Sequence, residues 1–157
     1  MDSFAEIKQT LFGKLICTTA ESEIPQNCIM IIDDNIDIIQ ALTAVLQSHY
    51  KVFSCIGYEE AKKELTAEVA VVLLDIKMGV KDGLEVFNLL KERRADLPII
   101  FHSAYSGSNE KAAAAQNLPH SGYLIKGEYN TTKLLDLIDH VLNQSDEGIL
   151  PNLENRL

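Results

Sequence analysis

Two uninterrupted apolar runs, each ending abruptly in aspartate, constrain the fold of this chain most. The first, CIMIIDD, covers residues 28–34, and the second, VAVVLLD, covers residues 69–75. Such runs are typical of strands in a parallel sheet that is covered on both faces. If the two strands are neighbours, three carboxylates meet at one edge: Asp33, Asp34 and Asp75. Each close pair repels by roughly 4 kcal/mol at an effective dielectric of 20, and a divalent cation with oxygen ligands relieves that repulsion.

Apolar runs and amphipathic segments alternate five times after Pro25. The predicted strands are 28–32, 51–54, 70–74, 98–102 and 122–125. The segments that follow them have helical spacing, at 36–46, 58–65, 84–90, 109–116 and 134–142, with Asp34 or Asn35 capping the first and Asn130 or Thr131 the last.

This alternation predicts a doubly wound α/β fold, a five-stranded parallel sheet with helices on both faces and right-handed crossovers. In the common strand order 2-1-3-4-5, strands 1 and 3 meet at the topological switch point, where ligands bind beyond the carboxyl ends of the strands. The three aspartates therefore belong to the expected binding edge.

The chain divides into three parts. Residues 1–26 form an N-terminal extension with apolar residues at helical spacing, residues 27–144 form the domain, and residues 145–157 form a C-terminal tail. We expect the extension to be helical, and either to pack on the domain or to support dimerisation or docking. The tail is too short to be an output domain.

Composition limits the classes of partner. The 157 residues carry a formal net charge of −9 with a pI of about 4.8, which argues against nucleic acid or an anionic membrane as the main partner. The three cysteines have no CxxC spacing, which favours free thiols in a reducing compartment. No apolar stretch approaches the roughly 20 residues of a membrane span, and no secretory signal is evident, so we expect a cytoplasmic protein.

Two further polar groups end strands at the same edge, Ser103 after the fourth strand and Lys126 after the fifth. A metal held by carboxylates, together with a hydroxyl and an amine, suits phosphoryl transfer, which depends on positioning and charge neutralisation. Taken singly, each residue has a simpler reading, as a helix cap, a turn residue or a solvated charge. Their joint placement at successive strand ends favours a site.

From Cys28 to Gln144 the chain resembles the receiver domain of two-component response regulators. The resemblance is carried by IIDDN at the first strand, LLDIKMGVKDGLEV at the third, HSA at the fourth and GYLIK at the fifth. It implies a flavodoxin-like and CheY-like fold, and a role in signal transduction. The members of this family are phosphoacceptors rather than classical enzymes, although they can catalyse their own phosphorylation and dephosphorylation.

The resemblance also implies roles for individual residues. Asp75 aligns with the aspartate that accepts a phosphoryl group. Mg²⁺, or Mn²⁺, would be held by Asp34, Asp75 and the backbone carbonyl of Lys77, with Asp33 acting mostly through a bound water. The phosphoryl-binding and switch residues would be Ser103, Ala104, Tyr123 and Lys126.

Three residues depart from the family pattern. Gly79 and Gly127 stand where proline is usual, so both loops should be looser, and the peptide bond after Lys126 has less reason to be cis. Lys77 places an unusual cation beside the acceptor. We predict that it alters the lifetime of the acyl phosphate.

The leading hypothesis is a single-domain receiver that is phosphorylated by a sensor histidine kinase or a phosphotransfer protein and signals by changing its contacts with a downstream protein or a second copy of itself. A phosphate-independent adaptor with the same fold is the alternative. A magnesium phosphatase of the haloacid-dehalogenase type is disfavoured, because such enzymes carry the nucleophile on the first strand in an acid-x-acid motif.

Overall fold

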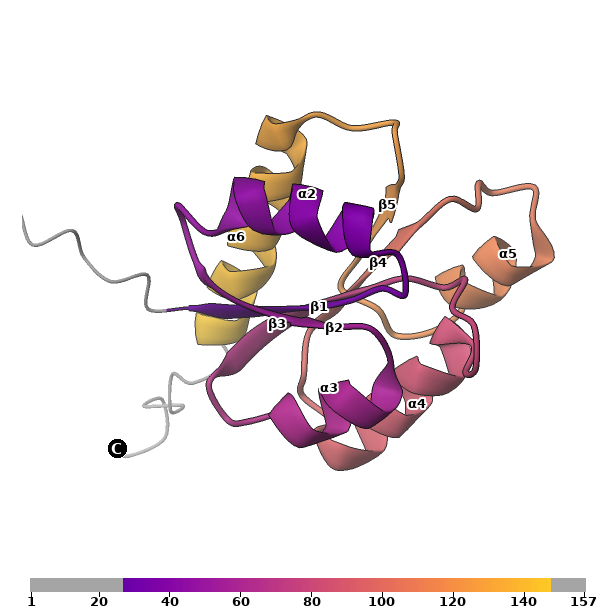
Figure 1. Cartoon of the computed structure of the whole chain (residues 1–157), viewed down its shortest axis with the longest axis horizontal. Coiled ribbons are helices and arrows are strands. Elements are labelled where there is room, and N and C mark those ends of the chain that lie inside the picture. Colours follow the sequence, from indigo (N-terminus) through magenta and orange to yellow (C-terminus); the bar gives the residue numbers. More distant parts are fainter. Residues whose placement is uncertain (1–26, 148–157) are drawn as a thin grey trace, which may run out of the picture.

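The structure is a computed structural model that describes residues 27–147. The N-terminal extension, residues 1–26, and the end of the tail, residues 148–157, lie outside the described residues, so the helix expected in the extension stays a prediction. Five parallel strands form one sheet in the order β2-β1-β3-β4-β5, which confirms the predicted order (Figure 1). Their bounds are β1 (Cys28–Ile32), β2 (Lys51–Cys55), β3 (Val69–Leu74), β4 (Ile99–Ser103) and β5 (Gly122–Ile125).

Helices cover both faces of the sheet, as predicted. They are α2 (Ile36–Leu46), α3 (Tyr58–Glu64), α4 (Gly83–Arg93), α5 (Glu110–Gln116) and α6 (Thr131–Glu147). Helices α2 and α6 pack on one face, and α3, α4 and α5 pack on the other (Figure 1). Within residues 27–147, no helix is both long and apolar enough to cross a membrane.

The central strands β1 and β3 explain the two apolar runs. Every residue of β1 is buried: Met30 and Ile32 belong to the core under α3 and α4, whereas Ile29 and Ile31 belong to the core under α2 and α6. Full burial of one such side chain contributes about 1.5–3 kcal/mol. An alternating polar pattern in these strands would place polar groups in one of the two cores.

Most observed ends lie within one residue of the predicted ones, but α4 continues to Arg93 and α6 runs from Thr131 to Glu147, beyond the predicted segments 84–90 and 134–142. Strand β4 begins at Ile99 rather than Pro98, which has no N–H for a ladder and contributes only its carbonyl, bonded by Val72 N–H at 3.0 Å. Asn35, rather than Asp34, caps α2, because its side chain accepts the N–H of Asp37. The side chain of Asn130 likewise accepts an N–H in the first turn of α6, at 2.9 Å.

Candidate functional site

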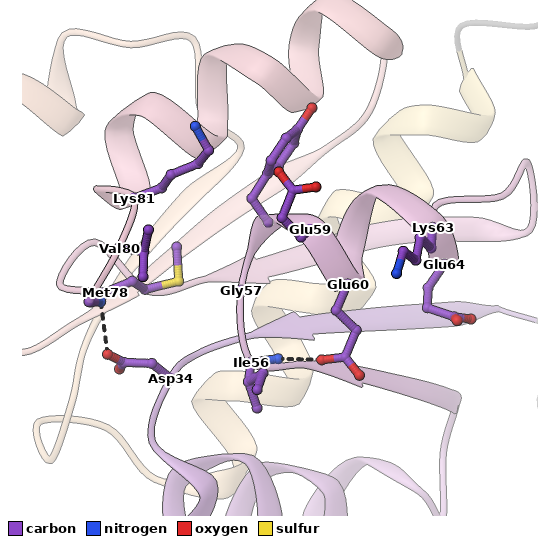
Figure 2. A pocket seen from close by; sticks show the side chains of 12 residues that line it. Asp34, Ile56, Gly57, Glu59, Glu60, Lys63, Glu64, Met78, Val80 and Lys81 are labelled. Atoms are coloured by element: carbon purple, nitrogen blue, oxygen red, sulfur yellow. Dashed lines mark hydrogen bonds between the residues drawn. The ribbon is translucent and has the colours of Figure 1, made fainter.

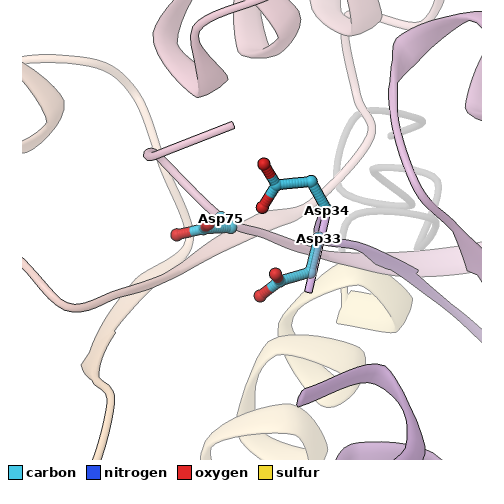
Figure 3. A group of neighbouring side chains, drawn as sticks. All are labelled: Asp33, Asp34 and Asp75. Atoms are coloured by element: carbon cyan, nitrogen blue, oxygen red, sulfur yellow. The ribbon is translucent and has the colours of Figure 1, made fainter. Parts of the chain in front are cut away.

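The three aspartates meet where β1 and β3 end. In the parallel register Ile32 pairs with Leu74, so Asp33 and Asp75 are the next residues on neighbouring strands. One carboxylate oxygen from each of Asp33, Asp34 and Asp75 lies within 4.8 Å of the other two (Figure 3). Asp33 is 1% exposed and Asp75 is 3% exposed, whereas Asp34 is open to solvent. The prediction that these side chains form a cluster is confirmed.

Lys126 provides the cation that faces this cluster. Its Nζ lies 2.7 Å from Asp33 Oδ2 and 3.3 Å from Asp75 Oδ1, and its backbone N–H donates to the carbonyl of Ser103 at 2.8 Å. One ammonium against three carboxylates leaves two negative charges uncompensated. The following residue, Gly127, has a φ of +83°, a region that favours glycine, and no peptide bond among residues 27–147 is cis.

The surroundings of Asp75 change the pKa of its carboxyl. Burial raises the pKa of its carboxyl from 3.8 to about 6, the ammonium of Lys126 opposes that rise, and the nearby carboxylate of Asp33 adds to it. Asp75 Oδ1 is buried and has no hydrogen-bond partner, because the ammonium at 3.3 Å lacks the geometry of a hydrogen bond. An orphaned carboxylate oxygen beside two further carboxylates fits the preference of Mg²⁺ for oxygen ligands.

A cavity of about 310 Å³ opens over the cluster. Six of the predicted site residues line it, namely Asp33, Asp34, Asp75, Lys77, Ala104 and Lys126. The cavity reaches Lys77 and Ala104 from loops that leave β3 and β4, so four strand ends contribute to one site. A small anion that entered it would face both the Lys126 ammonium and the Asp75 carboxylate.

Ser103 and Tyr123 lie beside the cavity rather than in its lining. Ser103 is fully buried, and its hydroxyl accepts the backbone N–H of Tyr105 at 3.2 Å. The Tyr123 hydroxyl donates to the carbonyl of Tyr105 at 2.8 Å, and its ring lies 6.1 Å from that of Phe101. Both predicted switch residues therefore contact the backbone of one residue in the loop after β4.

Comparison with known proteins decides the family. Residues 29–139 match the model of the response regulator receiver domain. The chain belongs to this family.

Two curated relatives show how much of a longer protein the receiver spans. The transcriptional regulatory protein TdiR of Thauera aromatica is 32% identical over 118 residues, which are 73% of this chain and 50% of TdiR. The response regulator protein FleR of Pseudomonas aeruginosa is 28% identical over 119 residues, 74% of this chain and 25% of FleR. The receiver thus spans about half the length of one relative and a quarter of the other.

Solved structures support the same fold. A CheY-like receiver domain protein from Methanospirillum hungatei JF-1 has a TM-score of 0.70 at 22% identity, covering 78% of this chain and 98% of its own. The response regulator protein TrrA from Thermotoga maritima, solved in complex with Mg(2+)-BeF, has a TM-score of 0.62 at 28% identity, covering 74% and 99%. The predicted CheY-like fold is confirmed.

His102 of the receiver is buried in β4 and is not among the residues that line the cavity over the aspartates. Its Nε2 lies 2.6 Å from the Tyr129 hydroxyl. Burial, and to a smaller extent the charge of Lys126, lowers the pKa of His102 from 6.5 to about 4, so the ring is neutral at pH 7. No sequence signal marks Tyr129 as its partner.

Gly83 is a further residue that shapes the site of the receiver. The sequence DG at 82–83 indicates a turn, but it does not show that a Cβ at Gly83 would lie 2.1 Å from the backbone oxygen of Asp75. Only glycine allows α4 to begin so close to the backbone of Asp75.

A larger hollow, about 680 Å³, adjoins the site between the loops after β2 and β3 (Figure 2). Its lining includes the exposed apolar side chains of Ile56 and Val80. Asp34, Met78 and Gly79 line both hollows, so the loop after β3 separates the aspartate cluster from an apolar surface.

Proposed function

We propose that this chain is a phosphorylation-dependent receiver whose Asp75 accepts a phosphoryl group from the histidine of a sensor kinase or a phosphotransfer protein. The observation that carries the proposal is the environment of the buried Asp75 carboxylate. Its Oδ1 accepts no hydrogen bond, lies 3.3 Å from the Lys126 ammonium, and is beside two further carboxylates. Structural aspartates seldom occupy such an environment, because it costs folding free energy.

The residues that would hold Mg²⁺, or Mn²⁺, are Asp33, Asp34, Asp75 and the backbone carbonyl of Lys77. A bound divalent cation would neutralise charge on the transferring phosphoryl group and on the carboxylates. Since the donor set consists of oxygens and includes an orphaned one, it fits such a cation.

In the transfer, a carboxylate oxygen of Asp75 attacks phosphorus and forms the acyl phosphate. The bond between phosphorus and the donor histidine nitrogen breaks, and the nitrogen keeps the electron pair. Lys126 then bridges the phosphoryl group as a point charge, in place of its present contact with Asp75. The Ser103 hydroxyl and the backbone of Ala104 contribute hydrogen bonds to the phosphoryl oxygens.

The same hydroxyl connects phosphorylation to a change of shape. If Ser103 turns its hydroxyl to the phosphoryl group, Tyr105 N–H loses its acceptor. Because Tyr105 also accepts the hydroxyl of Tyr123, the aromatic ring and the loop after β4 respond together. The surface formed by α5, β5 and α6 would carry the signal to a partner.

We infer that the partner is another protein or a second copy of this chain, and that this contact forms in the cytoplasm without nucleic acid or membrane. The net charge of −9 supports a protein partner. The curated relatives are longer than the region that matches this chain, so the inference about partners rests on the receiver domain alone.

The proposal is tested by incubation with MgCl₂ and acetyl phosphate, read by intact mass and by size-exclusion chromatography. We expect a gain of one phosphoryl group in the wild type and none in Asp75→Asn. Beryllofluoride should change the NMR spectrum of the wild type and leave that of Asp75→Asn unchanged. No mass gain and no beryllofluoride response would contradict phosphorylation and leave the phosphate-independent adaptor.

A further inference from the structure

A single hydrogen bond joins the exposed aspartate of the cluster to the loop after β3. The backbone N–H of Gly79 donates to Asp34 Oδ2 at 3.0 Å, across 45 positions of sequence (Figure 2). Asp33 and Asp75 need no such restraint, since both are buried and contact Lys126. Asp34 is open to solvent, so this bond limits the freedom of its side chain.

The bond is compatible with ligation of a cation by the same carboxylate. A carboxylate has two oxygens and about four acceptor positions, so it can accept one N–H and still bind a metal ion. With the bond formed, an Asp34 oxygen already lies within 4.8 Å of oxygens from the other two aspartates. Hydrogen bonds of this kind orient metal ligands and raise metal affinity.

We propose that the Gly79 N–H is a positioning group for the metal ion, which holds Asp34 in the orientation that completes the carboxylate cluster. This inference rests on the proposed function, because it assumes that the cluster binds Mg²⁺. It gives the glycine a chemical role, since proline, the usual residue of the family pattern at this position, has no N–H to donate.

The chain offers a matched pair of substitutions at this position. A Cβ at Gly79 would lie 3.6 Å from Asp34 Oδ2, an ordinary contact, and the backbone there does not have a positive φ. Gly79→Ala therefore keeps the N–H and reduces only chain flexibility, whereas Gly79→Pro removes the N–H. Val80→Pro is a second control, because it stiffens the same loop and keeps the donor.

The experiment is a calorimetric titration of MgCl₂ into the full chain. Wild type, Gly79→Ala and Val80→Pro should bind Mg²⁺ within about twofold of one another, and Gly79→Pro about tenfold more weakly. Equal or tighter binding by Gly79→Pro overturns the inference. An equal loss in Val80→Pro overturns it too, because loop stiffness would then be the cause.

A second measurement decides the matter if the proline variant does not fold. By NMR, exchange of the Gly79 amide hydrogen in the wild type should slow about fivefold when MgCl₂ saturates the site, because the bond persists in the loaded protein. Asp34→Ala should remove this response. Faster exchange with Mg²⁺ would mean that the metal displaces the bond, and the inference would be wrong.

The two proposals fail in different ways. A wild type that neither binds Mg²⁺ nor gains mass at Asp75 contradicts the proposed function, and the role of Gly79 with it. A wild type that does both, with a Gly79→Pro variant of equal affinity, contradicts only the role of Gly79.

Discussion

Replacing Asp75 by asparagine should stabilise the metal-free protein. The folded environment raises the pKa of this carboxyl from 3.8 to about 6, mainly through burial. At about 1.36 kcal/mol per pKa unit, the ionised carboxylate costs about 3 kcal/mol of folding free energy at neutral pH. Asparagine has nearly the same shape and no charge, so Asp75→Asn avoids this cost and keeps the Lys126–Asp33 pair.

The stabilisation has a definite pH dependence. Because the folded pKa lies above the unfolded one, the folded state holds more protons between pH 3.8 and about 6, and the wild type loses stability as pH rises through this window. Asp75→Asn and wild type should therefore be equally stable near pH 3.5 and differ by about 3 kcal/mol at pH 7.5.

Comparing the two proteins at each pH isolates the effect of Asp75. His102 has a folded pKa of about 4, below its usual 6.5, so protonation of the unfolded state destabilises both proteins as pH falls through that range. The contribution of His102 cancels when the free energies of unfolding of the two proteins are subtracted at the same pH. Without the comparison, the opposite slopes of His102 and Asp75 would obscure each other between pH 4 and 6.

The assay is urea unfolding followed by far-UV circular dichroism in EDTA, from pH 3.5 to 7.5. In MgCl₂ the difference in free energy of unfolding between Asp75→Asn and wild type should be smaller. Mg²⁺ stabilises only a folded protein that binds it, and the wild type has the additional carboxylate of Asp75 as a ligand. Equal stabilities at pH 7.5, or a difference that does not change with pH, would refute the claim that burial of a charge dominates this site.

Three further predictions concern residues near Asp75. Lys126→Ala should lower the free energy of unfolding by about 3 kcal/mol at pH 7.5, measured by urea unfolding, since it leaves two buried carboxylates without their cation. An unchanged free energy of unfolding would show that these ion pairs do not stabilise the fold. Gly83→Ala should cost more than 3 kcal/mol, or prevent folding, because its Cβ meets the backbone of Asp75 at 2.1 Å, whereas Gly107→Ala, with open space, should be neutral. Lys77→Asn should change the dephosphorylation rate of the acyl phosphate at least about twofold, and equal rates would remove Lys77 from the mechanism.

Much of the fold could be predicted from local patterns in the sequence. The strands at 28–32 and 122–125 were predicted to the residue, because an apolar run bounded by polar turn residues is visible in the sequence itself. Alternation of strands and helices was enough to predict the topology, and topology placed the three aspartates together. Element ends were less predictable, since the cap of α2 depended on whether Asp34 or Asn35 turned toward the helix.

Contacts between separate loops could not be predicted from the sequence. Nothing local shows that the Gly79 N–H reaches Asp34, that Gly83 lies against the backbone of Asp75, or that Tyr129 meets His102. Each contact depends on how two strand-to-helix loops approach each other over the sheet edge, which is set by register and helix packing.

By itself, the sequence determined which elements form, in what order, and which chemical groups end the strands, because these follow from the period and composition of short segments. Only the tertiary structure decided that Asp75 keeps an unpartnered oxygen, that Lys126 lies closer to Asp33 than to Asp75, and that Asp34 remains exposed. Burial and Coulomb interactions depend on distances and solvent access between segments remote in the chain, and these exist only once the sheet and its helices are packed.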